Sequence, residues 1–79
     1  MRLDKFLKNS RVIKRRTIAN EACDSGRVTV NGRTAKASYE VTVGDLIEIR
    51  YGEKLIKFEV LSLNEGTTKA NSEGMIKIL

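Results

Sequence analysis

The first apolar positions of the chain repeat with the period of an α-helix. Leu3, Phe6 and Leu7 stand at i, i+3 and i+4, so they fall on one side of a short helix. The next apolar pair is Val12 and Ile13, inside a basic connector that separates this helix from a second one. We therefore expect the first helix to bury one face and the connector to be anchored by these two side chains.

The second helix has clearer end signals. Thr17 is the expected N-cap, and Gly26 is the expected left-handed residue at the C-terminal end. The predicted buried stripe consists of Ile18, Ala19, Ala22 and Cys23. The two alanines indicate a close approach to the packing partner, and Cys23 is expected to act as a small apolar residue.

From residue 27 onward the apolar positions alternate with a period of two, which is typical of β-strands. Residues 28–30 run into Asn31-Gly32, a pair that favours a type I′ hairpin turn because both central positions need positive φ. Residues 33–35 are expected to form the return strand. A second turn is predicted at Gly44-Asp45.

Two half-buried strands follow at 47–51 and 56–60, and their register can be predicted. A two-residue loop at Gly52-Glu53 sets Glu48 opposite Lys57, whereas a four-residue loop sets Arg50 against Lys57. Like charges directly opposite each other are destabilising, and glycine at the first loop position suits a type II′ turn. We therefore predict the shorter loop.

The last part of the chain divides into a polar stretch and a short apolar end. Residues 64–74 are polar and contain glycine, which predicts a mobile loop, and residues 75–79 are expected to dock as an edge strand. The predicted fold is α+β, with two short packed helices on a small bent antiparallel sheet of four or five strands. The domain is expected to span 1–63, with 64–79 as a loop and terminal strand.

Composition limits the function. The chain has 79 residues, no His and one Cys, and none of its apolar runs exceeds two residues. This pattern excludes a transmembrane helix, a signal peptide and a disulfide framework, so the cytoplasm is the expected compartment. Without His and with scattered carboxylates, neither an acid–base site nor a metal site can be assembled. We expect a binding protein, neither an enzyme nor a holder of cofactors.

Charge is segregated along the chain. Residues 1–36 carry ten Lys and Arg against three Asp and Glu, a net charge of +7, whereas residues 37–79 carry a net charge of −2. A basic segment of this kind produces a local positive field that favours a polyanion. Only four residues are aromatic, and Phe6 and Phe58 fall on core faces, so a platform for stacking bases is poorly supplied. The pattern favours a folded RNA that is recognised through its phosphates.

Several segments, taken together and in order, resemble the S4 RNA-binding domain, named for small-subunit ribosomal protein four, with its αL motif. They are residues 2–7, Arg11, 14–17, 26–32 and 43–45. Within that family the chain is similar to the short stand-alone members, which include a fifteen-kilodalton heat-shock protein and ribosome-associated quality control factors. Its length and its short apolar ending favour the quality control group.

The resemblance implies a non-enzymatic monomer that binds the large ribosomal subunit after a stalled ribosome splits. The implied partners are large-subunit rRNA, peptidyl-tRNA and a quality-control protein that synthesises C-terminal alanine tails without a template. Asp4 is expected to orient a neighbouring arginine or to cap the first helix. The RNA contacts carried over by position are Arg2, Lys5, Arg11, Lys14, Arg15, Arg16, Arg27 and Asn31.

Two other classes of function remain open. An assembly or regulatory interaction module could use the sheet face, with Tyr39, Tyr51 and residues 75–79 as contacts. Within the RNA-binding class, a ribosome assembly or heat-shock factor that recycles large subunits with a nascent chain is also an alternative. A DNA-binding protein is the weakest alternative, because the helix at 18–25 lacks the Arg, Lys or Gln side chains that contact bases.

Overall fold

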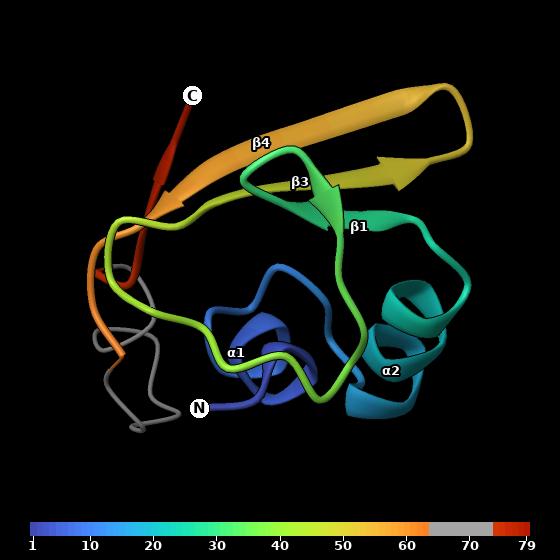
Figure 1. Ribbon diagram of the computed structural model, residues 1–79, viewed down its shortest axis with the longest axis horizontal. Helices are drawn as coiled ribbons and strands as arrows, with labels where there is room; N and C mark the ends of the chain where they lie inside the picture. The colour runs from blue at the N-terminus through green and yellow to red at the C-terminus, as the bar shows by residue number, and fades with distance from the viewer. Residues whose placement is uncertain (64–73) are drawn as a thin grey trace.

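The computed structural model describes residues 1–63 and 74–79 and has two helices packed on one face of an antiparallel sheet (Figure 1). The helices are α1 (Leu3–Asn9) and α2 (Arg16–Asp24). The strands are β1 (Val28–Val30), β2 (Arg33–Thr34), β3 (Leu46–Tyr51), β4 (Lys54–Val60) and β5 (Ile76–Ile78), in the sheet order β2-β1-β3-β4-β5. The predicted α+β architecture is confirmed.

Helix α1 forms where the apolar spacing predicts it. Leu3, Phe6 and Leu7 are completely buried, and the Phe6 ring stacks on Phe58 of β4 with ring centroids 6.5 Å apart. The N-cap residue Arg2 makes no side-chain capping bond, and backbone carbonyls of the segment 36–40 accept the first two N–H groups of α1. The Leu3 N–H donates to the carbonyl of Tyr39 at 2.8 Å. The helix is therefore attached from its first residue to the segment that connects β2 with β3.

Helix α2 differs from the prediction at its start. It begins at Arg16, and its N-cap is Arg15, which makes no side-chain capping bond, so the prediction of Thr17 as N-cap is wrong. Arg15 has an extended backbone, and the Ala19 N–H donates to the Arg15 carbonyl at 3.1 Å, which closes the first turn of the helix. The N-cap therefore lies two residues before the best capping residue type.

The predicted buried stripe of α2 is correct for three of its four members. Ala19, Ala22 and Cys23 are buried, but Ile18 is 43% exposed. Ile18 lies at the margin of the stripe and borders a hollow beneath the β3–β4 hairpin instead of the core. In the connector, Ile13 is buried and Val12 packs partly buried against the core, as predicted.

The turns and the strand register match the sequence predictions. Asn31 and Gly32 have φ values of 53° and 84°, as a type I′ turn requires. Strands β3 and β4 pair Ile49 with Ile56 and Glu48 with Lys57, which is the register of the two-residue loop. Gly52 has a φ of 55°, consistent with a type II′ turn, and the Lys57 ammonium lies 3.4 Å from a Glu48 carboxylate oxygen.

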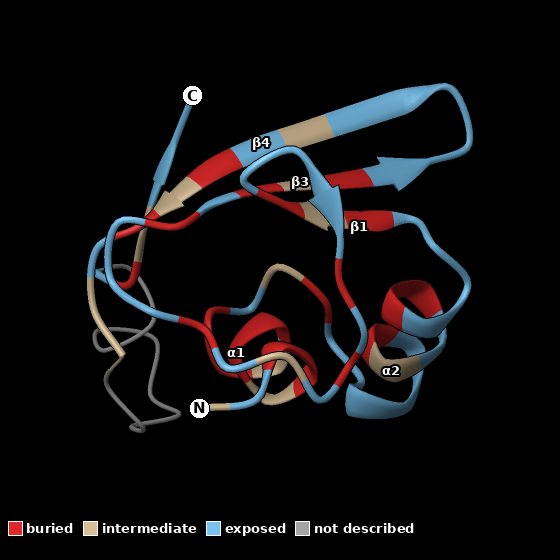
Figure 2. Ribbon diagram, in the orientation of Figure 1, coloured by how far each residue is buried: buried red, intermediate tan, exposed pale blue. Residues whose placement is uncertain are grey.

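The core lies between the helices and the inner face of β1, β3 and β4, whereas the far end of the β3–β4 hairpin is exposed (Figure 2). That end projects past the core above α2 (Figure 1). Strand β5 pairs with the outer edge of β4, and Met75 before it is buried, which confirms the predicted terminal strand. The predicted loop falls mainly on residues 64–73, outside the described residues, and the division at residue 63 stays a prediction.

Candidate nucleic-acid interface

The buried carboxylate of Asp4 joins the two helices and gathers two arginines. Its Oδ1 accepts hydrogen bonds from the Arg2 Nε at 3.3 Å and from the Lys5 N–H at 2.8 Å. Its Oδ2 accepts from the Asn20 amide at 3.2 Å and from the Arg16 Nε at 3.5 Å. We call Asp4, Arg2, Arg16 and Asn20 the Asp4 cluster. The predicted role of Asp4 in orienting a neighbouring arginine is confirmed.

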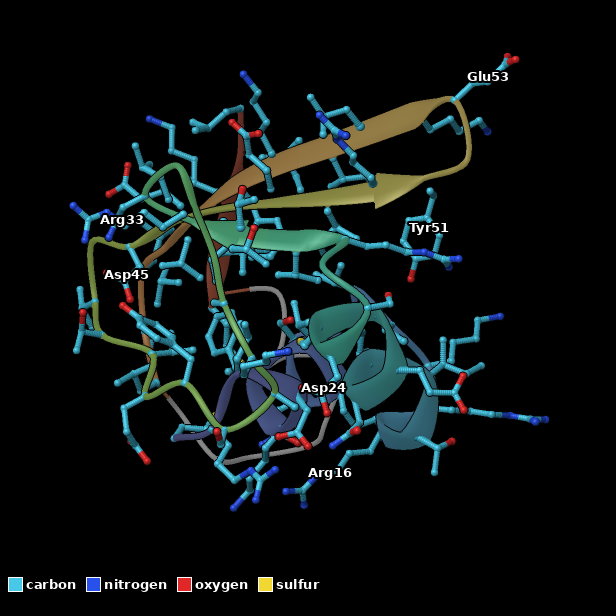
Figure 3. All side chains as sticks on the ribbon, turned by 45° about the vertical axis from the view of Figure 1, so that its right-hand side comes forward. Arg16, Asp24, Arg33, Asp45, Tyr51 and Glu53 are labelled. Atoms are coloured by element: carbon cyan, nitrogen blue, oxygen red, sulfur yellow. The ribbon has the colours of Figure 1, made fainter. Side chains whose placement is uncertain are left out.

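The cluster keeps its carboxylate ionised while its arginines reach solvent. Burial by itself raises the pKa of Asp4, but the Asn20 amide, the Lys5 N–H and the charges of Arg16 and Arg2 outweigh burial and hold the pKa below its ordinary value. The Asp4 side chain is 3% exposed, whereas those of Arg2 and Arg16 are 47% and 50% exposed. Figure 3 shows Arg16 on the side of the helices that faces away from the sheet.

A second group of cations lies at the other end of α1. Lys8, Arg11 and Lys14 line a hollow of about 360 Å³ together with Asn9, and we call it the connector hollow. Lys8 stands four residues after Asp4, so both lie on the same side of the helix, about 6 Å apart. Cationic side chains therefore extend from the Asp4 cluster along α1 to the connector.

The backbone of the connector is sharply turned where these cations meet. Arg11 has a φ of 62°, a left-handed conformation that is uncommon for residues other than glycine. The N–H of Arg11 donates to the Lys8 carbonyl at 3.1 Å, and the Ile13 N–H donates to the Leu7 carbonyl at 3.1 Å. This turn reverses the chain within a few residues and returns Ile13 to the core.

The predicted site residues fall into two groups. Six lie at the start of α1 or on it, on the connector or in the first turn of α2, and all are exposed except the half-buried Lys5: Arg2, Lys5, Arg11, Lys14, Arg15 and Arg16. The other two, Arg27 and Asn31, lie on the sheet side, before β1 and in the β1–β2 turn. The structure thus gathers the first group on the helical part and leaves the second apart from it.

The side chain of Asn31 already has partners within the protein. Its amide nitrogen donates to Asp45 Oδ1 at 3.1 Å, and its amide oxygen accepts from the Leu46 N–H at 3.0 Å. Asp45 also accepts from the Tyr39 hydroxyl at 3.2 Å and from the Thr42 N–H at 2.9 Å. These contacts tie the β1–β2 turn to the start of β3, and contact of Asn31 with RNA stays a prediction.

Sequence reasoning missed Asn20 and Lys8 as parts of this surface. A signal for Asn20 was present, because it follows Arg16 by four residues and shares its side of α2. Lys8 has the corresponding spacing from Asp4. Neither residue could be assigned without knowing that the two helices pack side by side with Asp4 between them.

The one cysteine, Cys23, is buried and protonated at neutral pH. Burial, and to a smaller extent the charges of Asp4 and Asp24, raise the pKa of its thiol to about 12. Among the described residues, no three His, Cys, Asp or Glu side chains gather where they could hold a metal ion. Within 1–63 and 74–79, neither helix has the length and apolar character that crossing a membrane requires.

Comparison with known proteins gives the family. The family model of the S4 domain matches residues 1–47, which contain both helices and the β1–β2 hairpin. The solved structure of the heat shock protein 15 of Vibrio cholerae, described as trimeric, has a TM-score of 0.90 and 28% sequence identity, covering 100% of this chain and 81% of that one. The class is thus that of S4-domain proteins.

Two curated relatives align along the whole chain. The RQC P-site tRNA stabilizing factor of Streptococcus pneumoniae is 51% identical over 79 residues, which cover 90% of that protein. The factor of the same name from Bacillus subtilis is also 51% identical over 79 residues, which cover 92% of its length. The chain belongs to the S4 domain family and, within it, to the group of the RQC P-site tRNA stabilizing factors.

Proposed function

We propose that this chain is a non-enzymatic RNA-binding factor of ribosome-associated quality control. In this proposal it binds the large ribosomal subunit that remains after a stalled ribosome splits, and it holds the peptidyl-tRNA there against large-subunit rRNA. The held tRNA then serves a separate protein that adds C-terminal alanine tails without a template. The names of its full-length relatives, which describe stabilisation of P-site tRNA, support this role.

The observation that carries the proposal is the Asp4 cluster. Arg2 and Arg16 are fourteen positions apart in the sequence, yet both donate through Nε to one buried carboxylate. A guanidinium group held by a carboxylate loses less conformational freedom when it binds a phosphate, and Arg matches phosphate oxygens bidentately. Together with Lys5, Arg11, Lys14 and Arg15, these arginines supply the cationic surface that a structured RNA requires.

The alternative in which the sheet face docks a partner has less support. Tyr39 donates its hydroxyl to Asp45, and Met75 is part of the core, so two of its predicted contacts are used inside the protein. Removal of residues 75–79 would therefore disturb folding. Ile78, which is 64% exposed on β5, offers a cleaner test of that surface.

The experiment that tests the proposal measures sedimentation of the protein with isolated large ribosomal subunits. We expect Arg16→Ala to weaken this association about tenfold and to lower the slope of log affinity against log salt by about one unit, because one phosphate contact is lost. The free energy of unfolding should change by no more than about 1 kcal/mol, because Arg16 is half exposed.

Arg33→Ala is the matched control. Arg33 is also an exposed arginine, but it lies on β2 at the edge of the sheet, away from both helices. The proposal predicts that this variant binds large subunits nearly as well as the parent. If Arg16→Ala and Arg33→Ala bind equally well, the helical surface is not the RNA-binding surface.

A further inference from the structure

A hollow between α2 and the β3–β4 hairpin lies outside the surface described above. The inner face of the hairpin extends past the core, so Tyr51 points to the side of the helices and is still 37% exposed. Figure 3 shows Tyr51 between the hairpin and α2, whereas Glu53 at the hairpin tip points away. An aromatic ring is therefore held at an accessible position on the inner side of the sheet.

The opposite wall of the hollow belongs to α2. Ile18 and Ala22 line it, and Ile18 is 43% exposed, although the sequence predicts it in the core. The hollow has a volume of about 210 Å³. Ile18 and Tyr51 thus face each other across a space that is open to a flat aromatic ligand.

The charged residues that border the hollow are two arginines and one glutamate. Arg27, just before β1, and Arg50 of β3 both border it, and the Arg50 N–H donates to the Arg27 carbonyl at 2.9 Å. Arg50 alternates with Tyr51 along β3, so its side chain leaves the other face of the sheet. Glu21 lines the helix side and is the acidic residue of the rim. A phosphate is therefore favoured at Arg27, while the carboxylate of Glu21 can accept a hydrogen bond from the exocyclic amino group of a base.

We propose that this hollow binds one unpaired nucleobase of the RNA, with its ring against Tyr51 and a flanking phosphate at Arg27. This inference rests on the proposed function, because it assigns a second contact to the same RNA. A base contact adds selectivity that phosphate contacts lack, because unpaired bases are present at bulges, loops and junctions and absent from a regular helix. Tyr51 becomes a specificity-determining residue.

Other ligands fit the hollow less well. A peptide side chain would meet the apolar walls but would leave Arg27 without an anionic partner. A free nucleotide would gain the same stacking as a base in RNA, but it would lack the further phosphate contacts on the helices. A base that is part of an RNA already held by α1 and the connector uses both surfaces.

The experiment uses two stem-loop RNAs that differ at one position. One carries a single bulged 2-aminopurine, and the other carries the same 2-aminopurine paired with uridine. We expect the parent protein to bind the bulged RNA about tenfold more tightly than the paired RNA, because stacking of a base on an aromatic side chain has about this effect. The fluorescence of the bulged base should be quenched on binding.

Variants of both walls separate stacking from folding. Tyr51→Leu keeps an apolar side chain but removes the ring, so it should bind the two RNAs equally, whereas Tyr51→Phe should behave as the parent. Ile18→Asn, on the exposed part of the opposite wall, should reduce the preference without the loss of a strand residue. Thermal unfolding of each variant verifies that it is folded.

The outcomes distinguish this inference from the proposed function. If the parent binds both RNAs equally, or if Tyr51→Leu retains the preference for the bulge, the inference is wrong. In that case large-subunit binding that depends on Arg16 still supports the proposed function. If Arg16→Ala has no effect on large-subunit binding while the Tyr51-dependent preference is present, the proposed function fails and the base-binding site stands.

Discussion

The helical region and the sheet region each contain a buried aspartate, and the two carboxylates have different partners. Asp4 is bound by two arginines, an asparagine and a backbone N–H, and its arginines reach solvent. Asp45 is bound by neutral donors from Asn31, Tyr39 and Thr42, all within the connections of the sheet. A carboxylate surrounded by neutral donors fixes a turn, whereas one surrounded by arginines also positions charge for a partner.

The difference also appears in what compensates for burial. Burial raises the pKa of both carboxyl groups. For Asp45, the Thr42 N–H, the Asn31 amide and the hydroxyls of Thr42 and Tyr39 outweigh burial, and the pKa is lowered. For Asp4, part of the compensation comes from the charges of Arg16 and Arg2. Added salt should therefore affect the two regions differently, because it screens charges and has little effect on hydrogen bonds between neutral donors and a buried acceptor.

The largest expected effect is that of Asp45→Ala on stability. Removal of the carboxylate leaves several donors of the β1–β2 turn and the 39–42 segment unpaired, so the free energy of unfolding should fall by about 3 kcal/mol. Unfolding in urea measures this change. Tyr39→Phe removes one of these donors and should cost only about 1 kcal/mol. A loss as small for Asp45→Ala as for Tyr39→Phe would contradict a structural role for this network.

The next effect is that of Asp4→Asn on RNA binding. The variant keeps the side-chain shape but removes the charge that holds Arg2 and Arg16, so binding to large ribosomal subunits should weaken about fivefold, while stability falls by about 1 kcal/mol. Glu53→Gln, at the exposed hairpin tip, removes the same charge and is the control. Tighter binding by Asp4→Asn would mean that Asp4 acts only by repelling RNA.

A double-mutant cycle shows whether Asp4 acts through Arg16. If it does, the effect of Asp4→Asn on large-subunit binding should be much smaller in a chain that already carries Arg16→Ala. Equal effects in both backgrounds would mean that the two residues act independently. Sedimentation with large subunits at one fixed salt concentration provides the four affinities.

The smallest expected difference is in the response to acid. Both aspartates have folded-state pKa values below the unfolded value, so they contribute stability above about pH 4, which is lost as pH falls through the folded-state values. Added salt should reduce the contribution of Asp4 more than that of Asp45. Unfolding at several pH values, in low and high salt, for Asp4→Asn and Asp45→Asn measures this. A contribution of Asp45 that is equally sensitive to salt would contradict the comparison.

Local features of this fold could be predicted from the sequence because their signals involve near neighbours. The Asn31-Gly32 turn follows from the positive φ that both residues tolerate, and the β3–β4 register follows from the charge pair of Glu48 and Lys57. The buried stripe of α1 follows from the spacing of its apolar residues. In each case the physical preference is expressed within a few residues or across one hairpin.

The candidate site could be predicted only in part. The basic residues of 2–16 could be chosen because charge is visible in the sequence, whereas the convergence of Arg2 and Arg16 on Asp4 depends on how α1 packs against α2. The prediction of Thr17 as N-cap is wrong because the path of the connector, rather than the best capping residue type, determines where α2 begins. The prediction of Ile18 as a core residue is wrong because Ile18 borders a hollow beneath the β3–β4 hairpin, and that hollow is not filled by core side chains.

The sequence by itself determined the helices, the turns, the register of the central hairpin and the excess of positive charge in the first half of the chain. The tertiary structure alone decided which charges share one carboxylate and which apolar side chains line a hollow instead of the core. The reason is that helix and turn preferences act over a few residues, whereas the position of a side chain relative to distant groups is set by the packing of whole elements.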